Sequence, residues 1–193
     1  TAIFNGLSIG APFDSEKIDS QFEEVYKMML ARMEGMRDDR SVFLPNVIVS
    51  DPATGLTQRI DLLRVDPFGN MQIINFANTG SISKSEYNTT NFDLGANSIL
   101  VKKNIQTTVT AKMFTGLQMA LTKRILENLG FMVDEGTMTI NLDKTKDGFL
   151  DGTVLHAASE NQYIVDQIIP LDIAEENKMV VDQIMDQMRN PEA

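Results

Sequence analysis

The sequence predicts an α/β domain, because the period of its apolar residues changes along the chain. Two segments, residues 14–35 and 111–129, carry apolar side chains at the three- and four-residue steps of an amphipathic helix. Strand-like segments rich in branched aliphatic residues lie between them, and a further alternating segment follows at residues 137–142. Helices that alternate with groups of strands predict a sheet covered by helices.

The composition sets limits on the class of protein. The chain has 193 residues, of which 42% are hydrophobic, which is enough for the core of one domain. No stretch approaches the roughly 18 apolar residues of a membrane span, so we expect a soluble, cytoplasmic protein without membrane contact. The absence of cysteine and the single histidine, His156, exclude thiolate metal sites and histidine-rich zinc centres within one chain.

The helices are bounded by recognisable signals. Asp14 or Ser15 can cap the first helix, and Gly35 lies near its end. Gly130 is the expected stop of the second helix. Pro170 and Asp172 indicate a final helix that runs to about Met188 and packs on the domain or on a partner. We therefore expect a main domain at residues 1–169 and a C-terminal helical appendage at residues 170–193.

Three strands are expected between the first two helices. In the segment 42–49, Pro45 cannot donate a ladder hydrogen bond, so pairing is expected only from Asn46 onward. Segments 60–65 and 71–76 predict a hairpin around the turn at residues 66–70. The polar stretch 78–97 is expected to be a loop, and residues 99–110 a short strand or the approach to a helix.

The hairpin carries the most specific pattern. Ile60-Asp61-Leu62-Leu63, the turn at Gly69-Asn70 and Ile73-Ile74-Asn75-Phe76-Ala77-Asn78-Thr79-Gly80 resemble the core of RecB-like PD-(D/E)XK nucleases. That core has the pattern G-x-I-D-L-L, a turn, and I-I-D-[YF]-K-T-[SG]. Val47-Ile48-Val49 resembles the preceding strand, and the segment from Gln118 to Leu126 resembles the Q-L-A-L-Y-x-x-x-L helix.

The resemblance covers residues 14 to 142 in the order helix, three strands, helix and strand. It implies a restriction-endonuclease-like core, which is a central mixed β-sheet flanked by α-helices, here with an extra C-terminal helix. In this family acidic residues hold Mg²⁺, and a lysine activates or stabilises the attacking water.

At the positions implied by the resemblance, most of this chemistry has been replaced. Asp61 matches the first aspartate and is the residual metal-binding candidate, while Asn75 replaces the second acid and Ala77 replaces the lysine. Asn46 stands where some relatives carry a glutamate, and Gln118 matches the helix glutamine. The resemblance thus implies an inactive nuclease-like module in a larger assembly, such as a phage or bacterial DNA-processing complex, with no cofactor. A phage origin would make virion association the alternative to a cytoplasmic location.

A second function stays open, in which an active Mg²⁺-dependent DNA nuclease uses Asp61 with displaced partners. Lys84 or Lys112 would supply the lysine, and Glu23 or Glu24 the acid. An active chain would need these groups in one compact pocket.

The charge of the chain favours protein partners over nucleic acid. The net charge is −10, and phosphate binding draws its affinity from lysine and arginine. Contact with nucleic acid would therefore depend on a local basic patch, for which Lys102-Lys103 and Lys123-Arg124 are the candidates. The sequence leaves the oligomeric state open.

Overall fold

The computed structural model describes residues 2–35, 37, 40–80, 90–133, 136–143, 149–150, 153–154, 164–172 and 175–190. Its main feature is a mixed sheet in the order β1-β2-β3-β7-β10, with the short β6 beside β3. The strands β1, β2 and β3 are successively antiparallel, β7 runs parallel to β3, and β10 is antiparallel to β7. The strands are β1 (Val42–Ser50), β2 (Thr57–Val65), β3 (Asn70–Gly80), β6 (Met132–Val133), β7 (Gly136–Asp143) and β10 (Ile164–Asp172).

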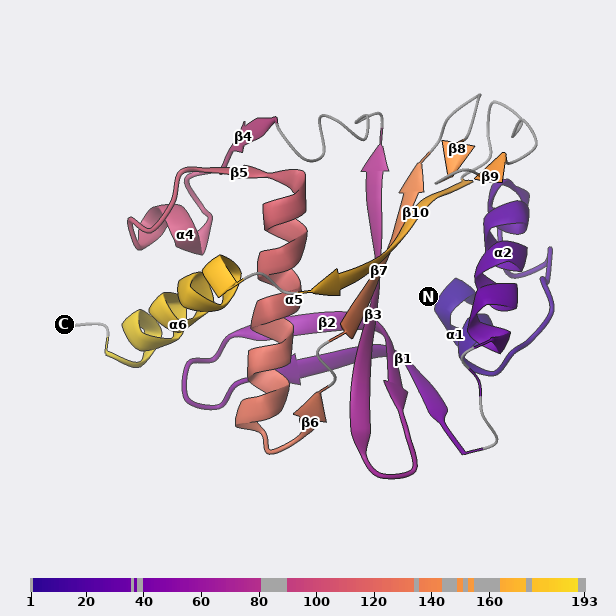
Figure 1. Cartoon of the computed structure of the whole chain (residues 1–193), viewed down its shortest axis with the longest axis horizontal. Coiled ribbons are helices and arrows are strands. Elements are labelled where there is room, and N and C mark those ends of the chain that lie inside the picture. Colours follow the sequence, from indigo (N-terminus) through magenta and orange to yellow (C-terminus); the bar gives the residue numbers. More distant parts are fainter. Residues whose placement is uncertain are drawn as a thin grey trace.

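Helices cover both faces of this sheet (Figure 1). On one side lie α1 (Ala2–Ser8), the 3₁₀ turn η1 (Ser20–Phe22) and α2 (Glu23–Glu34). On the other side α5 (Ala111–Asn128) crosses the sheet, and α6 (Glu175–Arg189) packs against α5. The predicted α/β class, with a mixed sheet between helices and an additional C-terminal helix, is confirmed.

Smaller elements complete the described chain. The short helix α4 (Ile99–Lys102) follows β4 (Asn91–Asp93), which pairs with β5 (Thr108–Thr110). A second small pair joins β8 (Phe149–Leu150) and β9 (Thr153–Val154). Residues 99–110 therefore hold both a short helix and a short strand. Among the described residues, none of the helices has the length and apolar character that crossing a membrane requires.

The core is divided between the two faces of the sheet. The cluster under α5 joins Ile60, Leu63 and Ile73 to Met119 and Ile125. The cluster under α1 and α2 contains Leu62 and Ile74 from the sheet together with Leu7, Tyr26 and Met33. Each fully buried aliphatic side chain contributes about 1.5–3 kcal/mol. The hairpin β2–β3 supplies both clusters and is therefore the centre of the fold.

The predicted hairpin is confirmed, with Val65 opposite Met71 and Leu62 opposite Ile74. Its turn depends on Asp66, whose Oδ1 accepts hydrogen bonds from the backbone N–H of Phe68 (2.8 Å) and of Asn70 (2.9 Å). Asn70 Nδ2 donates to Asp66 Oδ2 at 3.0 Å. Gly69 takes a φ of 84°, a left-handed conformation that glycine adopts without steric cost. Side-chain chemistry therefore fixes the register of the hairpin.

The expected limit on β1 pairing is wrong, because the ladder includes Pro45. Val42 pairs with Val65 at one end of the ladder and Ser50 with Thr57 at the other, and Pro45 lies opposite Leu62. In the described part of the sheet β1 is an edge strand, and an edge position tolerates a residue without an N–H.

The first predicted helix starts later than expected. Asp14 forms a turn instead, in which its Oδ1 accepts from the N–H of Glu16 at 3.0 Å. Asp19 then accepts from the N–H of Gln21 at 3.0 Å and caps η1. The turn η1 leads directly into α2, whose own N-cap residue, Phe22, makes no side-chain capping hydrogen bond. Helix α1 lies before residues 14–35, the segment whose apolar periodicity predicted the first helix, so α1 was not predicted.

The last predicted helix also starts later. Pro170 lies in β10 opposite Met138, so the expected boundary between residues 169 and 170 falls inside a strand. Proline is again tolerated because β10 is the last strand in the described part of the sheet. Val181 and Met185 of α6 belong to the same apolar cluster as Ile73 of β3.

Two further predictions from the sequence are confirmed. The helix expected at residues 111–129 is α5, which Thr110 caps by accepting a hydrogen bond from Met113 N–H at 3.1 Å. The strand expected at residues 137–142 lies within β7.

We expect Gly6→Ala to destabilise the chain by about 1–3 kcal/mol through overpacking. A Cβ at Gly6 would clash with the hydroxyl of Tyr26, which is fully buried and donates to the Ala11 carbonyl at 2.7 Å. Chemical denaturation of Gly6→Ala, Tyr26→Phe and the double variant measures this. Removing the hydroxyl should recover most of the loss, and additive costs in the double variant would contradict the explanation.

Candidate functional site

The fold brings three of the sequence-predicted positions into one row across three strands. Asn46 and Asp61 lie between the Pro45–Leu62 and Val47–Ile60 pairs of the β1–β2 ladder. Leu62 and Ile74 form the last pair of the β2–β3 ladder. Asp61 immediately precedes Leu62, and Asn75 immediately follows Ile74. The row Asn46, Asp61, Asn75 therefore occupies the point where the ladder is interrupted on one side of β2 and ends on the other.

The backbone around Asp61 departs from a regular strand. Asn46 has a φ of 52°, a left-handed conformation that asparagine adopts more readily than most residues. In a regular strand Ile60 and Leu63 would lie on opposite faces, yet both belong to the cluster under α5. Leu62 lies in the cluster on the other face. The alternation of faces along β2 is therefore interrupted at Asp61.

The Asp61 carboxylate is buried and already has a cationic partner. The residue is only 5% exposed, and its Oδ1 accepts a hydrogen bond from Arg59 Nη2 at 3.0 Å. The Arg59 side chain is 64% exposed, so its guanidinium reaches from solvent to the carboxylate. Asn75 is half-buried in the neighbouring strand and offers an amide oxygen without negative charge. The row thus holds one carboxylate, one internal counter-ion and two carboxamides.

The remaining sequence-predicted residues do not join this row on the described surface. Ala77 lies in β3 opposite Asn141 of β7. Gln118 is exposed on α5, and its backbone carbonyl accepts a hydrogen bond from the hydroxyl of Thr122 at 2.7 Å. Lys84 lies outside the described residues.

The candidates for a displaced acid and lysine are also placed. Glu23 pairs with Lys27 at 2.7 Å in the first turns of α2, and Glu24 is exposed. Lys112 is the second residue of α5. Both glutamates therefore lie on the helix that covers the α1–α2 face of the sheet.

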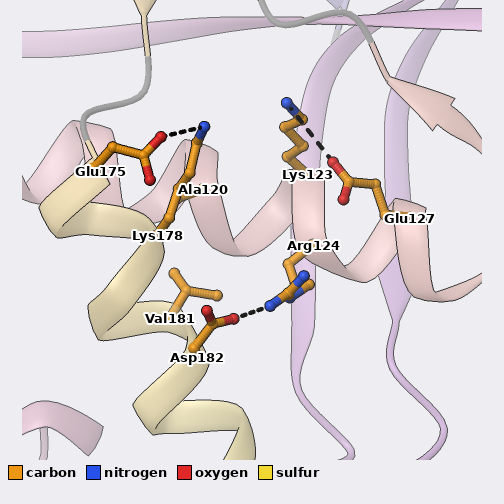
Figure 2. Close-up of a pocket in the computed structure, with 8 residues that line it drawn as sticks. All are labelled: Ala120, Lys123, Arg124, Glu127, Glu175, Lys178, Val181 and Asp182. Atoms are coloured by element: carbon orange, nitrogen blue, oxygen red, sulfur yellow. Dashed lines mark hydrogen bonds and ion pairs between the residues drawn. The ribbon is translucent and has the colours of Figure 1, made fainter.

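A second polar feature is a groove of about 250 Å³ between α5 and α6. Figure 2 shows three ion pairs along it. Arg124 of α5 pairs with Asp182 of α6, Lys123 lies 3.7 Å from Glu127, and Lys178 lies 3.0 Å from Glu175. Lys123 is buried, and Ala120 and Val181 complete the groove. The four-residue spacing of Lys123 and Glu127 is a sequence signal for an ion pair within one helix. The ion pair between Arg124 and Asp182 joins two helices, and no spacing in the sequence indicates it.

These ion pairs change the interpretation of the basic dipeptide Lys123-Arg124. Both cations have carboxylate partners within the protein, which offset part of the positive charge of this dipeptide. Lys102 at the end of α4 remains exposed, and Lys103 is half-buried.

A buried aspartate joins the β1–β2 connection to α5. Asp51 Oδ2 accepts from the N–H of Thr54 at 3.0 Å and from its hydroxyl at 2.6 Å, while Oδ1 accepts from Asn128 Nδ2 at 3.3 Å. The hydrogen bond from the Thr54 side chain is the main cause that lowers the pKa of Asp51, although burial opposes it. Asn128 and the field of Arg189 lower the pKa further. Asp51 was not predicted from the sequence as a residue of interest, and its hydrogen bonds give it a structural role.

Comparison with protein-family models, with curated proteins and with solved structures finds no match to this chain. Among the described residues, no three histidine, cysteine, aspartate or glutamate side chains lie close enough together to hold a metal ion.

We expect the Arg59–Asp61 pair to be coupled by about 0.5–1.5 kcal/mol, because one partner is buried and the other is largely exposed. Arg59→Gln should destabilise the wild-type chain by that amount and have almost no effect in an Asp61→Asn background. A double-mutant cycle measured by chemical denaturation gives the coupling. Equal costs of Arg59→Gln in both backgrounds would show that the pair does not stabilise the fold.

Asp51 should make stability depend on pH in the acid range. Because its pKa is lowered in the folded chain, its contribution is present above the ordinary value of 3.8 and is lost as the pH falls through the lower folded-state pKa. Asp51→Asn should cost about 1–2 kcal/mol at neutral pH and flatten this part of the acid-unfolding curve. Circular dichroism from pH 6 to pH 2, with exposed Asp93→Asn as the control, measures the difference; curves of equal slope would contradict it.

Proposed function

We propose that the chain is a catalytically inactive PD-(D/E)XK nuclease-like module that serves as a binding or structural part of a larger assembly. The observation that carries the proposal is the row Asn46, Asp61, Asn75. The residues that the resemblance assigns to three motif positions, though distant in sequence, occupy neighbouring register positions on three strands. The order of α2, β1, β2, β3, α5 and β7 also agrees with the order of elements that the resemblance implies.

The chemistry of the row supports an inactive module. A divalent cation between two carboxylates has two negative charges to offset its own, whereas this row has one carboxylate. Arg59 already supplies a positive charge to that carboxylate at 3.0 Å. Asparagine at position 75 and alanine at position 77 provide neither the second charge nor a group that could activate water.

The distribution of charge supports a protein partner. The net charge of −10 repels the phosphate backbone of nucleic acid at long range. In the described chain, the cations of the Lys123-Arg124 dipeptide are used in ion pairs with Glu127 and Asp182. The exposed Lys102 offers a smaller basic feature, so contact with nucleic acid is the weaker form of the proposal.

The proposal predicts that the purified chain binds neither Mg²⁺ nor Mn²⁺ and does not cleave DNA. Isothermal titration with both ions and cleavage assays on single- and double-stranded DNA test this, with Asp61→Ala as the matched control. Metal-dependent cleavage that Asp61→Ala abolishes would overturn the proposal and establish the alternative nuclease, with its acid and lysine supplied from other positions.

A gain-of-function variant tests the assignment of the positions themselves. Asn75→Asp combined with Ala77→Lys restores the second acid and the lysine, so we expect measurable Mn²⁺ binding that Asp61→Ala removes. Gln72→Glu with Ala77→Lys is the control, because it adds the same charges with the acid three residues away on β3. Equal Mn²⁺ binding by both variants would show that the position of the acid is irrelevant and would contradict the assignment.

A further inference from the structure

A cleft of about 820 Å³ lies between α1 and the segment at residues 11–18, on the side of the sheet that α1 and α2 cover (Figure 1). Its walls are mostly apolar, and several of the side chains that line it are small. The apolar lining includes Ala2, Gly6, Ile9 and Phe13. Small-molecule sites are typically apolar clefts of about 300–1,000 Å³ with a few polar groups. The cleft therefore has the size and the lining of a small-molecule site.

The cleft stays open because the large side chains beside it are held in the core. Tyr26 forms its floor, is fully buried and donates to the Ala11 carbonyl at 2.7 Å. Phe13 packs edge-on against Tyr26, with 5.8 Å between the ring centroids. Gly6 leaves room for the Tyr26 hydroxyl, and Ala2 lies one turn earlier on the same face of α1. Small residues at these two positions leave space that larger side chains would fill.

Hydrogen bonds hold the segment opposite α1 in place. The N–H of Ala11 donates to the Gly6 carbonyl at 2.9 Å and ties the start of the segment to α1. At the other end, the N–H groups of Lys17 and Ile18 donate to the Asp14 carbonyl at 3.1 Å and 2.9 Å. Ile18 is itself buried in the cluster under α1 and α2. Because the cleft is formed in advance, a ligand does not bear the entropic cost of ordering it.

The charged groups at the mouth of the cleft favour a cationic ligand. Asp14 and Glu16 supply two carboxylates, and Lys17 supplies one ammonium group. Lys17 pairs with Asp14 at 3.1 Å, and Glu16 is exposed. The hydrogen bond from Lys17 is the main cause that lowers the pKa of Asp14, so this carboxyl is ionised at neutral pH. The mouth is therefore negative, as is the whole chain with its net charge of −10, and both attract a cation.

Ile9 adds apolar surface at the edge of the cleft. It directly follows α1 and is 76% exposed. A ligand that covers this side chain removes apolar surface from water, which favours binding. The apolar walls and the acidic mouth together fit a molecule with an apolar body and one positively charged amino group.

We propose that the cleft binds a small apolar amine, with its aromatic or aliphatic body against Ile9 and Phe13 and its ammonium group beside Glu16. This goes beyond the proposed function, because it assigns a ligand to a surface that the nuclease-like motif does not use. The cleft meets the row at one point, where Asn46 Nδ2 donates to Asn5 Oδ1 at 3.5 Å. No residue of the row takes part in binding the amine, so the two proposals can fail separately.

Phenylbutylamine is a defined test ligand, and phenylbutyrate, which carries a carboxylate in place of the amine, is its matched anion. We would titrate each into the full chain and follow backbone amide shifts by NMR. The amine should shift residues 2–18 and Tyr26 to saturation, and phenylbutyrate should bind about threefold more weakly. Glu16→Gln should remove most of this preference. Glu176→Gln, which removes an exposed carboxylate on α6, should not change it.

Two further variants test the walls of the cleft. Ala2→Phe places a ring in the cleft, and Ile9→Ser removes the apolar contact at its edge. Each should weaken binding of the amine about tenfold. Ala53→Phe and Ile48→Ser make the same changes at exposed positions outside the cleft and should leave binding unchanged.

Three results would overturn this inference: shifts confined to residues outside the cleft, equal binding of the two ligands, or binding that both Ala2→Phe and Ile9→Ser leave intact. Ile9→Ser changes an exposed side chain, so it tests the cleft even if Ala2→Phe disturbs α1. DNA cleavage assays on the same wild-type sample keep the outcomes separate. Cleavage would refute the inactive module whatever the amine does, and a failure to bind the amine would leave that module unaffected.

Discussion

The rest of the structure depends on the pairing of β2 with β3, because this hairpin is buried on both faces. Leu63 and Ile73 pack under α5, and Leu62 and Ile74 pack under α1 and α2. A slip of one residue would exchange the two sets of side chains between the faces. The hydrogen bonds of Asp66 fix the turn. This short-range motif therefore sets the strand register on which the packing of both helical layers depends.

The same register determines what the candidate site can be. Asp61 and Asn75 are neighbours because they flank the Leu62–Ile74 pair, and Asn46 is added to them by the β1 ladder. The scaffold therefore keeps the three positions close together while their side chains supply one negative charge. A fold can preserve the geometry of a site after its chemistry has changed, so the proposed function rests on the residues and their partners and not on the fold class.

The sequence predicted the central part of the fold well because its signals are local. The hairpin and α5 follow from the apolar period, the turn chemistry and the helix stop at Gly130. The errors occurred where tertiary context decides the outcome. Pro45 and Pro170 are tolerated because their strands are edges of the described sheet, which the local sequence does not reveal. Asp14 accepts a hydrogen bond in a turn and Asp19 caps η1, and the sequence alone does not tell these two uses of an aspartate apart. The Arg59–Asp61 pair and the ion pair between Arg124 and Asp182 depend on geometry in the same way.

The conformation of β1 has a consequence for how the chain behaves at high concentration. An exposed edge strand is a template on which further strands can add and start an aggregate. Here the proline at position 45 removes one hydrogen-bond donor, and the left-handed asparagine beside it breaks the straight run of the backbone. The edge is therefore a poor template for the addition of further strands, which opposes aggregation through this side of the sheet.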